Sequence, residues 1–181
     1  MIDKDESAMH LAYVMTEKRG MTDQLLSTFA GQLLGRGARL SGVAQTNTEC
    51  VDSHLCDMDL QVLPDGPVIR ISQSLGTGAR GCRLDPAALE QAVALVTASL
   101  DTGPQLLIVN KFGKHEADGR GFRPVIGDAL MRGIPVLAGV NGANHDAFLE
   151  FAEGMGQQLQ PDISDLERWF GEVEKDLSAV A

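Results

Sequence analysis

Aromatic residues and cysteines are scarce in this chain, which has six Phe, one Tyr, one Trp and three Cys. Few side chains are therefore available to stack on nucleic-acid bases. The net charge is −10, so a polyanion would be repelled over long range, and nucleic-acid binding is not expected. The odd number of cysteines and the acidic, polar start from Met1 to Ala8, which is unlike a secretory signal, favour the reducing cytoplasm.

Long apolar runs are also missing, since no stretch approaches the ~20 residues that a membrane-spanning helix needs. Membrane insertion is therefore not expected. The hydrophobic fraction of 44% suits a globular core, and 181 residues suit one domain better than two small ones. We expect a single domain over residues 1–181, with a flexible N-terminus at 1–8 and an acidic, amphipathic helix at 161–181.

Hydrophobic periodicity predicts strands that alternate with helices. Strands are expected at 9–15, 40–45, 56–62, 67–73, 106–109 and 134–140, and helices at 22–34 and 85–100, from after residue 120 to 131, at 146–153 and after Pro161. Thr22 or Asp23 is expected to cap the first helix, and Asp85, followed by Pro86, the second. Pro64-Asp65-Gly66 is a strong turn signal between two alternating runs, so 56–62 and 67–73 should form a hairpin.

This order predicts an α/β fold with a mostly parallel sheet, helices on both faces and an inserted β-hairpin. The wholly apolar run Leu106–Val109 is typical of a central parallel strand that is buried on both faces. Ligands of such sheets bind beyond the carboxyl ends of the strands. The loops that follow the strands are therefore where a binding site is expected.

Positive charge gathers in three of these loops. They hold eight of the 15 Lys and Arg residues: Lys18, Arg19, Arg80, Arg83, Lys111, Lys114, Arg120 and Arg123. Cations crowded at one edge of an acidic protein would repel one another unless an anion binds there, which favours an anion site. The alternative is ordinary exposed charge, paired in part with Glu17, Asp85, Glu116 and Asp118.

The segment after the first strand is comparable with a phosphate-binding loop, G-x-x-x-x-G-K-[ST], which lies between a strand and a helix. In Met15–Thr22 the second Gly and the Thr are matched by Gly20 and Thr22, whereas Met15 and Met21 replace the first Gly and the Lys. Gly20 can bring backbone N–H groups near an oxyanion, and the helix N-terminus favours negative charge. Because the missing Lys normally contacts the β- and γ-phosphates, efficient hydrolysis is not expected.

Four motifs together resemble a bacterial family known as Domain of Unknown Function 2478. They are Gln45-Thr46-Asn47-Thr48, Cys56-Asp57-Met58-Asp59-Leu60, Arg83-Leu84-Asp85 and Asn110-Lys111-Phe112-Gly113-Lys114. The resemblance covers nearly the whole chain past Met9. It implies a cytoplasmic protein that is nucleoside-triphosphatase-like or associated with molybdate transport, with no established reaction.

A more distant resemblance is to small P-loop nucleoside-triphosphatases of the kinase-like type. Their Asp-Glu-Ile-Gly-Lys-Met-Glu stretch after the central strand corresponds to residues 110–116 here. Gly113, Lys114 and Glu116 match, but Asn110 and Lys111 replace the two acids that handle magnesium and water. This resemblance implies a P-loop fold without its usual metal-phosphate machinery, and that loss favours binding over turnover.

Several residues offer other chemistry. Cys50, His54, Cys56 and Cys82 are candidate soft-metal ligands, although C-x-x-x-H-x-C is not a familiar zinc pattern and incidental thiols are commoner. Asp57 and Asp59, two apart on a strand, share a face that either meets solvent or holds a cation. His115 and Glu116 are candidates for acid–base chemistry, or are simply solvated. Asn141 and Asn144 either read a base or cap the next helix.

We therefore expect a binding protein for a small anion: a nucleotide, phosphate or molybdate. The expected site comprises Lys18, Arg19, Gly20, Thr22, Thr46, Asn47, Arg80, Arg83, Asn110, Lys111, Gly113 and Lys114. The main rival is a slow nucleoside-triphosphatase with Mg²⁺ at Asp57, Asp59 or Glu116, in which Glu116 or Lys114 would be catalytic. A metal-thiolate regulator, an adaptor that docks through its acidic last helix, and a homo-oligomer remain open.

Overall fold

The computed structural model describes residues 8–47, 57–74, 76 and 83–180. Its strands are β1 (Leu11–Val14), β2 (Leu40–Asn47), β3 (Met58–Val62), β4 (Val68–Arg70), β5 (Leu106–Phe112), β6 (Val136–Val140) and β7 (Gly156–Gln158). Its helices are α1 (Met21–Gly35), α2 (Pro86–Ser99), α3 (Lys114–Ala117), α4 (Arg123–Met131), α5 (His145–Ala152) and α6 (Ile163–Val180), with 3-10 turns η1 (Leu100–Thr102) and η2 (Gly142–Asn144).

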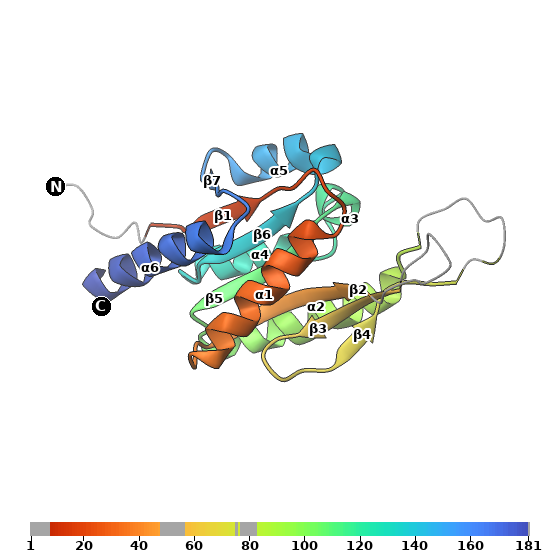
Figure 1. The fold of residues 1–181 in the computed structure, drawn as a ribbon, viewed down its shortest axis with the longest axis horizontal. Coiled ribbons are helices and arrows are strands. Elements are labelled where there is room, and N and C mark those ends of the chain that lie inside the picture. Colours follow the sequence, from red (N-terminus) through yellow and green to blue (C-terminus); the bar gives the residue numbers. More distant parts are fainter. Residues whose placement is uncertain (1–7, 48–56, 75, 77–82, 181) are drawn as a thin grey trace.

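The described strands form one sheet in the order β4-β3-β2-β5-β6-β1-β7 (Figure 1). The strands β2, β5, β6, β1 and β7 run parallel to their neighbours. The strands β3 and β4 are antiparallel and extend the sheet beyond β2. The prediction of a mostly parallel sheet with an inserted hairpin is thus confirmed, whereas the short, polar edge strand β7 was not predicted.

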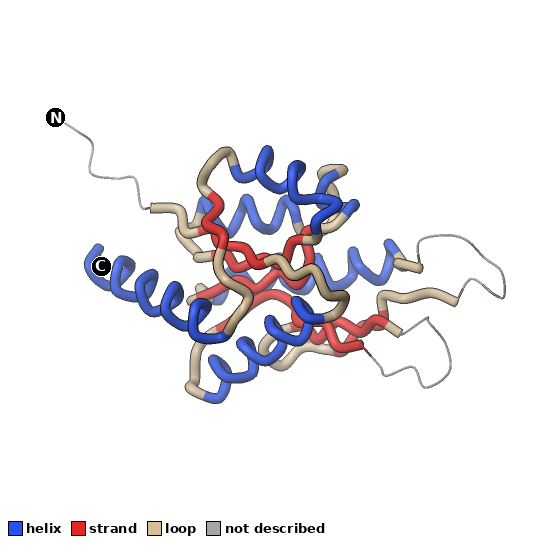
Figure 2. Tube along the Cα trace, turned by 45° about the horizontal axis from the view of Figure 1, so that its top comes forward, coloured by secondary structure: helices blue, strands red, loops and turns tan. Residues whose placement is uncertain are grey.

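Helices cover both faces of the sheet, as Figure 2 shows. Alternate residues of each central strand point to opposite faces. In β5, Leu107 and Val109 pack with α2, α4 and α5, whereas Leu106 and Ile108 pack with α1 and α6. Because burying one such side chain contributes roughly 1.5–3 kcal/mol, the apolar run of β5 fixes it at the centre of the sheet.

Local signals explain where the helices begin and end. The Asp85 carboxylate accepts the backbone N–H of Ala87 (3.0 Å) and of Ala88 (3.2 Å) and so caps α2, as predicted. In α6 the apolar residues Leu166, Trp169, Phe170 and Val173 are buried against the α1 face of the sheet, and the acidic side faces outward. None of the helices in the described part of the chain is long and apolar enough to cross a membrane.

Three expectations at the carboxyl edge of the sheet were wrong. Thr46 and Asn47, predicted in a loop, belong to β2. Asn110 and Lys111 likewise belong to β5, which continues to Phe112 across an irregularity in its pairing with β6. Neither Thr22 nor Asp23 caps α1, since Gly20 occupies the N-cap position. Polar residues continue these strands because their side chains find partners there.

Candidate anion site

Residues 15–20 lead from the carboxyl end of β1 directly into α1. Gly20 adopts the left-handed conformation (φ 81°), which glycine adopts without steric cost. No described side chain caps α1, and the Met21 N–H donates to the Lys18 carbonyl at 3.2 Å. The side chains of Lys18 and Arg19 are exposed beside this helix start. The segment therefore combines a positive helix end with two accessible cations.

Two threonines hold this segment closed. Thr16 Oγ1 donates to the Lys18 carbonyl at 3.1 Å and lies 2.8 Å from Thr22 Oγ1. A hydroxyl has one proton, so when Thr16 donates to Lys18, Thr22 is the donor to Thr16. The hydroxyl at the phosphate-loop position of Thr22 is thus used inside the protein. The pattern comparison identified Thr22, but no motif signalled its partner Thr16.

The start of α1 lies unusually close to the sheet. A Cβ at Gly139 of β6 would lie 2.3 Å from the Asn110 carbonyl oxygen and 2.8 Å from Cγ2 of Thr22. Only glycine leaves room for both neighbours at this position. Gly139 therefore allows the β1–α1 segment to sit directly over β5 and β6, where the carboxyl ends of the strands meet.

Asn110 links three elements at this edge. Its side chain is buried, and its Nδ2 donates to Asp23 Oδ1 of α1 at 2.8 Å and to Gln45 Oε1 of β2 at 3.4 Å. Its Oδ1 accepts the Gln45 backbone N–H at 3.0 Å. Since the amide can donate and accept, it satisfies both neighbours in a way that a carboxylate could not. Asp23 and Gln45 were not among the predicted site residues.

The segment after β5 is closed by Glu116. This buried carboxylate accepts the backbone N–H of Gly113 at 2.9 Å and of Phe122 at 3.0 Å. Gly121 (φ 59°) passes so close that its Cβ position lies 2.2 Å from Glu116 Oε1. Both oxygens of Glu116 therefore hold the backbone, which leaves it poorly placed for acid–base chemistry or for Mg²⁺.

The cations of this second segment divide into two groups. Arg123 lies 5.0 Å from the ring centre of Phe151 and donates to the carbonyls of Glu116 (3.4 Å) and Ala117 (3.5 Å). Arg120 pairs with Asp118 at 3.5 Å. Lys111 and Lys114 are exposed. The prediction of ordinary ion pairing thus holds for Arg120, while the two lysines remain accessible to a ligand.

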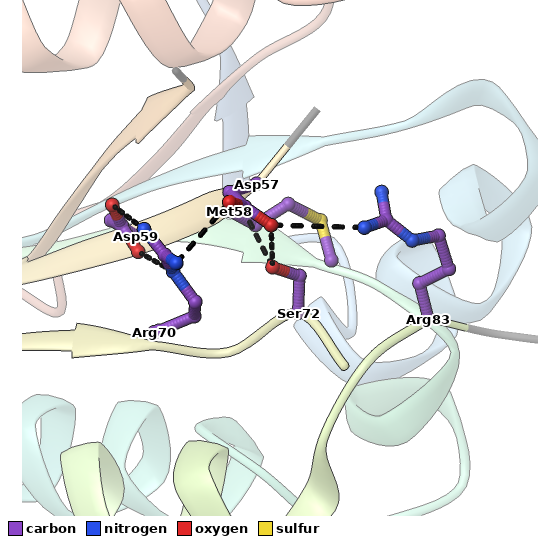
Figure 3. Close-up of polar contacts among 6 residues, drawn as sticks. All are labelled: Asp57, Met58, Asp59, Arg70, Ser72 and Arg83. Carbon is purple, nitrogen blue, oxygen red and sulfur yellow. Dashed lines mark hydrogen bonds and ion pairs between the residues drawn. The ribbon is translucent and has the colours of Figure 1, made fainter. Parts of the chain in front are cut away.

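An ion-pair network lies at the base of the β3–β4 hairpin (Figure 3). Asp57, just before β3, and Asp59 both contact the Arg70 guanidinium, at 3.2 and 3.0 Å. The two carboxylates share a face, as predicted, and the cation there is this arginine rather than a metal. Arg83 reaches Asp57 from the opposite side at 3.7 Å. Arg70 was not among the predicted site residues.

The described candidates therefore meet at one edge of the sheet. The three segments that carry Lys18, Lys114 and Arg83 all lie at the carboxyl ends of β1, β5 and β2. Asn141 Oδ1 accepts from the Asn144 N–H at 3.1 Å, so its capping role is confirmed, and His115 is half-buried.

Some predictions fall on residues that are not described. Arg80 and the thiolate candidates Cys50, His54, Cys56 and Cys82 lie outside the described residues. Within those residues, no group of three or more His, Cys, Asp or Glu side chains is arranged to hold a metal ion. The metal-thiolate hypothesis stays a prediction.

The fold defines the class of this protein. The chain resembles the solution structure of a human cancer-related nucleoside triphosphatase with a TM-score of 0.55, over 96% of this chain and 97% of that one. The two sequences are 16% identical, so the likeness concerns the fold alone. The fold is therefore α/β and P-loop nucleoside-triphosphatase-like.

Residues 11–169 match the model of a family described as "Protein of unknown function (DUF2478)", and the chain belongs to that family. It is also 35% identical, over 162 residues and 88% of its length, to the molybdenum import ATP-binding protein ModC 2 of Bradyrhizobium diazoefficiens. The match covers 18% of that relative, so this chain spans less than a fifth of the relative's length.

Proposed function

We propose that this protein binds a nucleotide or a tetrahedral oxyanion such as molybdate at the segment between β1 and α1. The observation that carries the proposal is the start of α1, where Gly20 is left-handed and no described side chain caps the helix. Backbone N–H groups at a helix start, together with the helix dipole, attract phosphate-like anions. The exposed Lys18 and Arg19 add charge at the same place.

The relatives support a ligand of this chemistry. The printed name of the 35% identical protein refers both to ATP binding and to molybdenum import. ATP phosphates and molybdate share the tetrahedral, negatively charged oxygens that the β1–α1 segment suits. Because the match covers only 18% of that protein, the shared region is one part of a larger assembly of activities.

Binding is a better-supported function than turnover. A phosphate loop needs a lysine for the β- and γ-phosphates, and Met21 stands there. Both oxygens of Glu116 accept backbone N–H groups, and Asp57 and Asp59 are paired with Arg70. The carboxylates available to the magnesium hypothesis thus already have partners.

Isothermal titration with ATP, GTP, phosphate, molybdate and tungstate tests the proposal. We expect at least one of these ligands to bind, and Lys18→Gln with Arg19→Gln to weaken that binding. Arg36→Gln is the matched control, because this exposed arginine pairs with Glu167 just beyond the C-terminal end of α1. Uniform absence of binding at millimolar ligand would contradict the proposal.

The rival function, a slow Mg²⁺-dependent nucleoside-triphosphatase, has a separate test. We expect no phosphate release from ATP or GTP above the rate without protein, with or without Mg²⁺. Release that requires Mg²⁺ and disappears in both Thr22→Ala and Lys114→Ala would establish the rival. The cytoplasmic location and the homo-oligomer stay predictions.

A further inference from the structure

The two arginines at the base of the β3–β4 hairpin are held very differently. Arg70 uses Nε and Nη2 on Asp59, at 3.0 and 3.4 Å, and Nη1 on Asp57 at 3.2 Å. These hydrogen bonds and charges raise the pKa of the Arg70 guanidinium, with the hydrogen bond to Asp59 as the largest cause. Arg70 is thus fixed by two carboxylates at once.

Arg83 is held more loosely by the same network. Its Nη2 lies 3.7 Å from Asp57 Oδ1, a separation at which charge attraction remains but a good hydrogen bond does not. In Figure 3 one terminal nitrogen of Arg83 faces Asp57, and the other points away from that carboxylate. The Arg83 side chain is 22% exposed, so solvent and small ions reach it.

Asp57 keeps its other partners when Arg83 turns away. Ser72 Oγ donates to Asp57 Oδ1 at 3.2 Å, and Arg70 contacts Oδ2 at 3.2 Å. Two carboxylates and two guanidiniums are neutral together, so Asp57 and Asp59 cancel the charge of Arg83 while no ligand is bound. An incoming anion can take over that charge without leaving Asp57 unpartnered.

The network lies at the ligand edge of the sheet. Met58 pairs with Asn47, the last residue of β2, so Asp57 lies beyond the carboxyl end of β2. The neighbouring strand β5 carries Asn110, which contacts both Gln45 of β2 and Asp23 of α1. Arg83 therefore approaches from the β2 side the same edge that the β1–α1 segment approaches from the other.

We infer that Arg83 is an exchangeable ligand-binding residue: it rests on Asp57 and moves to an oxygen of the bound phosphate or molybdate. Asp57 is its resident counter-ion, and Arg70 holds Asp57 in place. This inference rests on the proposed function and adds a specificity-determining residue to it. It also makes a counter-intuitive prediction, because removing Asp57 strengthens ligand binding.

Titration of ATP and of molybdate into matched variants tests this exchange. In Asp57→Asn we expect affinity to rise about two- to fivefold, the size of one exposed ion pair. In an Arg83→Gln background the same substitution should give no gain. Asp128→Asn is the control, since Asp128 contacts a guanidinium, that of Arg132, near the opposite edge of the sheet. It removes the same charge and should leave affinity unchanged.

A second variant keeps the inference testable if Asp57→Asn does not fold. In Arg70→Gln, Asp57 loses its other cation and holds Arg83 more tightly, so affinity should fall. Arg132→Gln, which also leaves two carboxylates without their arginine, should not change affinity. Opposite effects of substitutions on either side of one carboxylate are the signature of exchange.

The possible failures are distinguishable. If the unaltered protein binds neither probe, the proposed function is wrong and this inference falls with it. If the unaltered protein binds but Asp57→Asn leaves affinity unchanged, or raises it equally without Arg83, only the exchange is wrong. In that case the Arg83–Asp57 pair is a structural tie between two segments, and its loss should lower stability alone.

Discussion

Two segments leave the same edge of the sheet, one after β1 and one after β5, and they use their polar groups in opposite ways. After β5, the Glu116 carboxylate accepts two backbone N–H groups and Arg123 donates to two carbonyls, so the segment satisfies itself. After β1, no described side chain caps α1, and Lys18 and Arg19 face solvent. The first segment is built as a support and the second as a ligand site.

The largest effect on this comparison should come from removing Glu116. Glu116→Ala leaves two buried N–H groups without acceptors, and hydrogen bonds to charged groups contribute about 1.5–3 kcal/mol each. We expect the free energy of unfolding to fall by ~3 kcal/mol, as measured by urea denaturation. Asp118→Ala, which removes an exposed carboxylate paired with Arg120, should change it little.

A variant that keeps its stability but loses ligand binding would reverse the reading of Glu116. It would show that the carboxylate acts on the ligand rather than on the backbone. The two segments would then be parts of one site.

Gly139→Ala should have the next largest effect, because it separates the β1–α1 segment from β5. The added methyl group would meet the Asn110 carbonyl and Thr22 Cγ2. Overpacking of this kind costs about 1–3 kcal/mol, and ligand affinity should fall with it. Gly127→Ala, in a helix with open space around its Cβ position, should instead stabilise the protein by about 0.5–1 kcal/mol. Equal thermal shifts for both variants would contradict the account.

Asn110→Asp tests whether the amide is needed between α1 and β2. The substitution replaces the donor to Asp23 with a second carboxylate and leaves two acceptors facing each other. We expect a loss of about 1–2 kcal/mol in denaturation experiments at neutral pH, with weaker anion binding. Unchanged stability together with tighter binding would mean that the site was built for a metal cation.

The smallest effect is expected from restoring the lysine of a phosphate loop. Met21 is 45% exposed at the first position of α1, so Met21→Lys places a cation beside the proposed ligand. Affinity for ATP should rise about two- to fivefold in calorimetric titration, the range of one exposed charge interaction. Met131→Lys adds the same charge at the end of α4 and should not change affinity. A gain from both would indicate only general electrostatic attraction.

The sequence predicts the framework because the framework follows from apolar periodicity. The apolar runs of β5 and β6 and the Asp85-Pro86 helix start are visible without a structure. The strand β7 is not, since Gly156-Gln157-Gln158 is polar and pairs only because β1 needs a neighbour. A polar sequence at a sheet edge has no distinctive pattern of its own.

The site is less predictable because its polar groups are satisfied across long distances in the chain. Asn110 ended the apolar run and was therefore assigned to a loop, yet contacts with Asp23 and Gln45 keep it in the strand. Glu116 was interpreted as chemistry because its backbone partners, Gly113 and Phe122, have no sequence signature. The cationic edge, by contrast, was predictable from the order of strands and loops.

The central claim concerns the place where the ligand binds, and backbone amide NMR of this 19.3 kDa protein tests it most directly. Addition of ATP or molybdate should shift the Gly20, Met21, Thr22 and Asp23 amides most. The amides of residues 157–160, which line a groove between β7 and α6, should stay in place. Shifts that concentrate in this groove and spare the start of α1 would contradict the account.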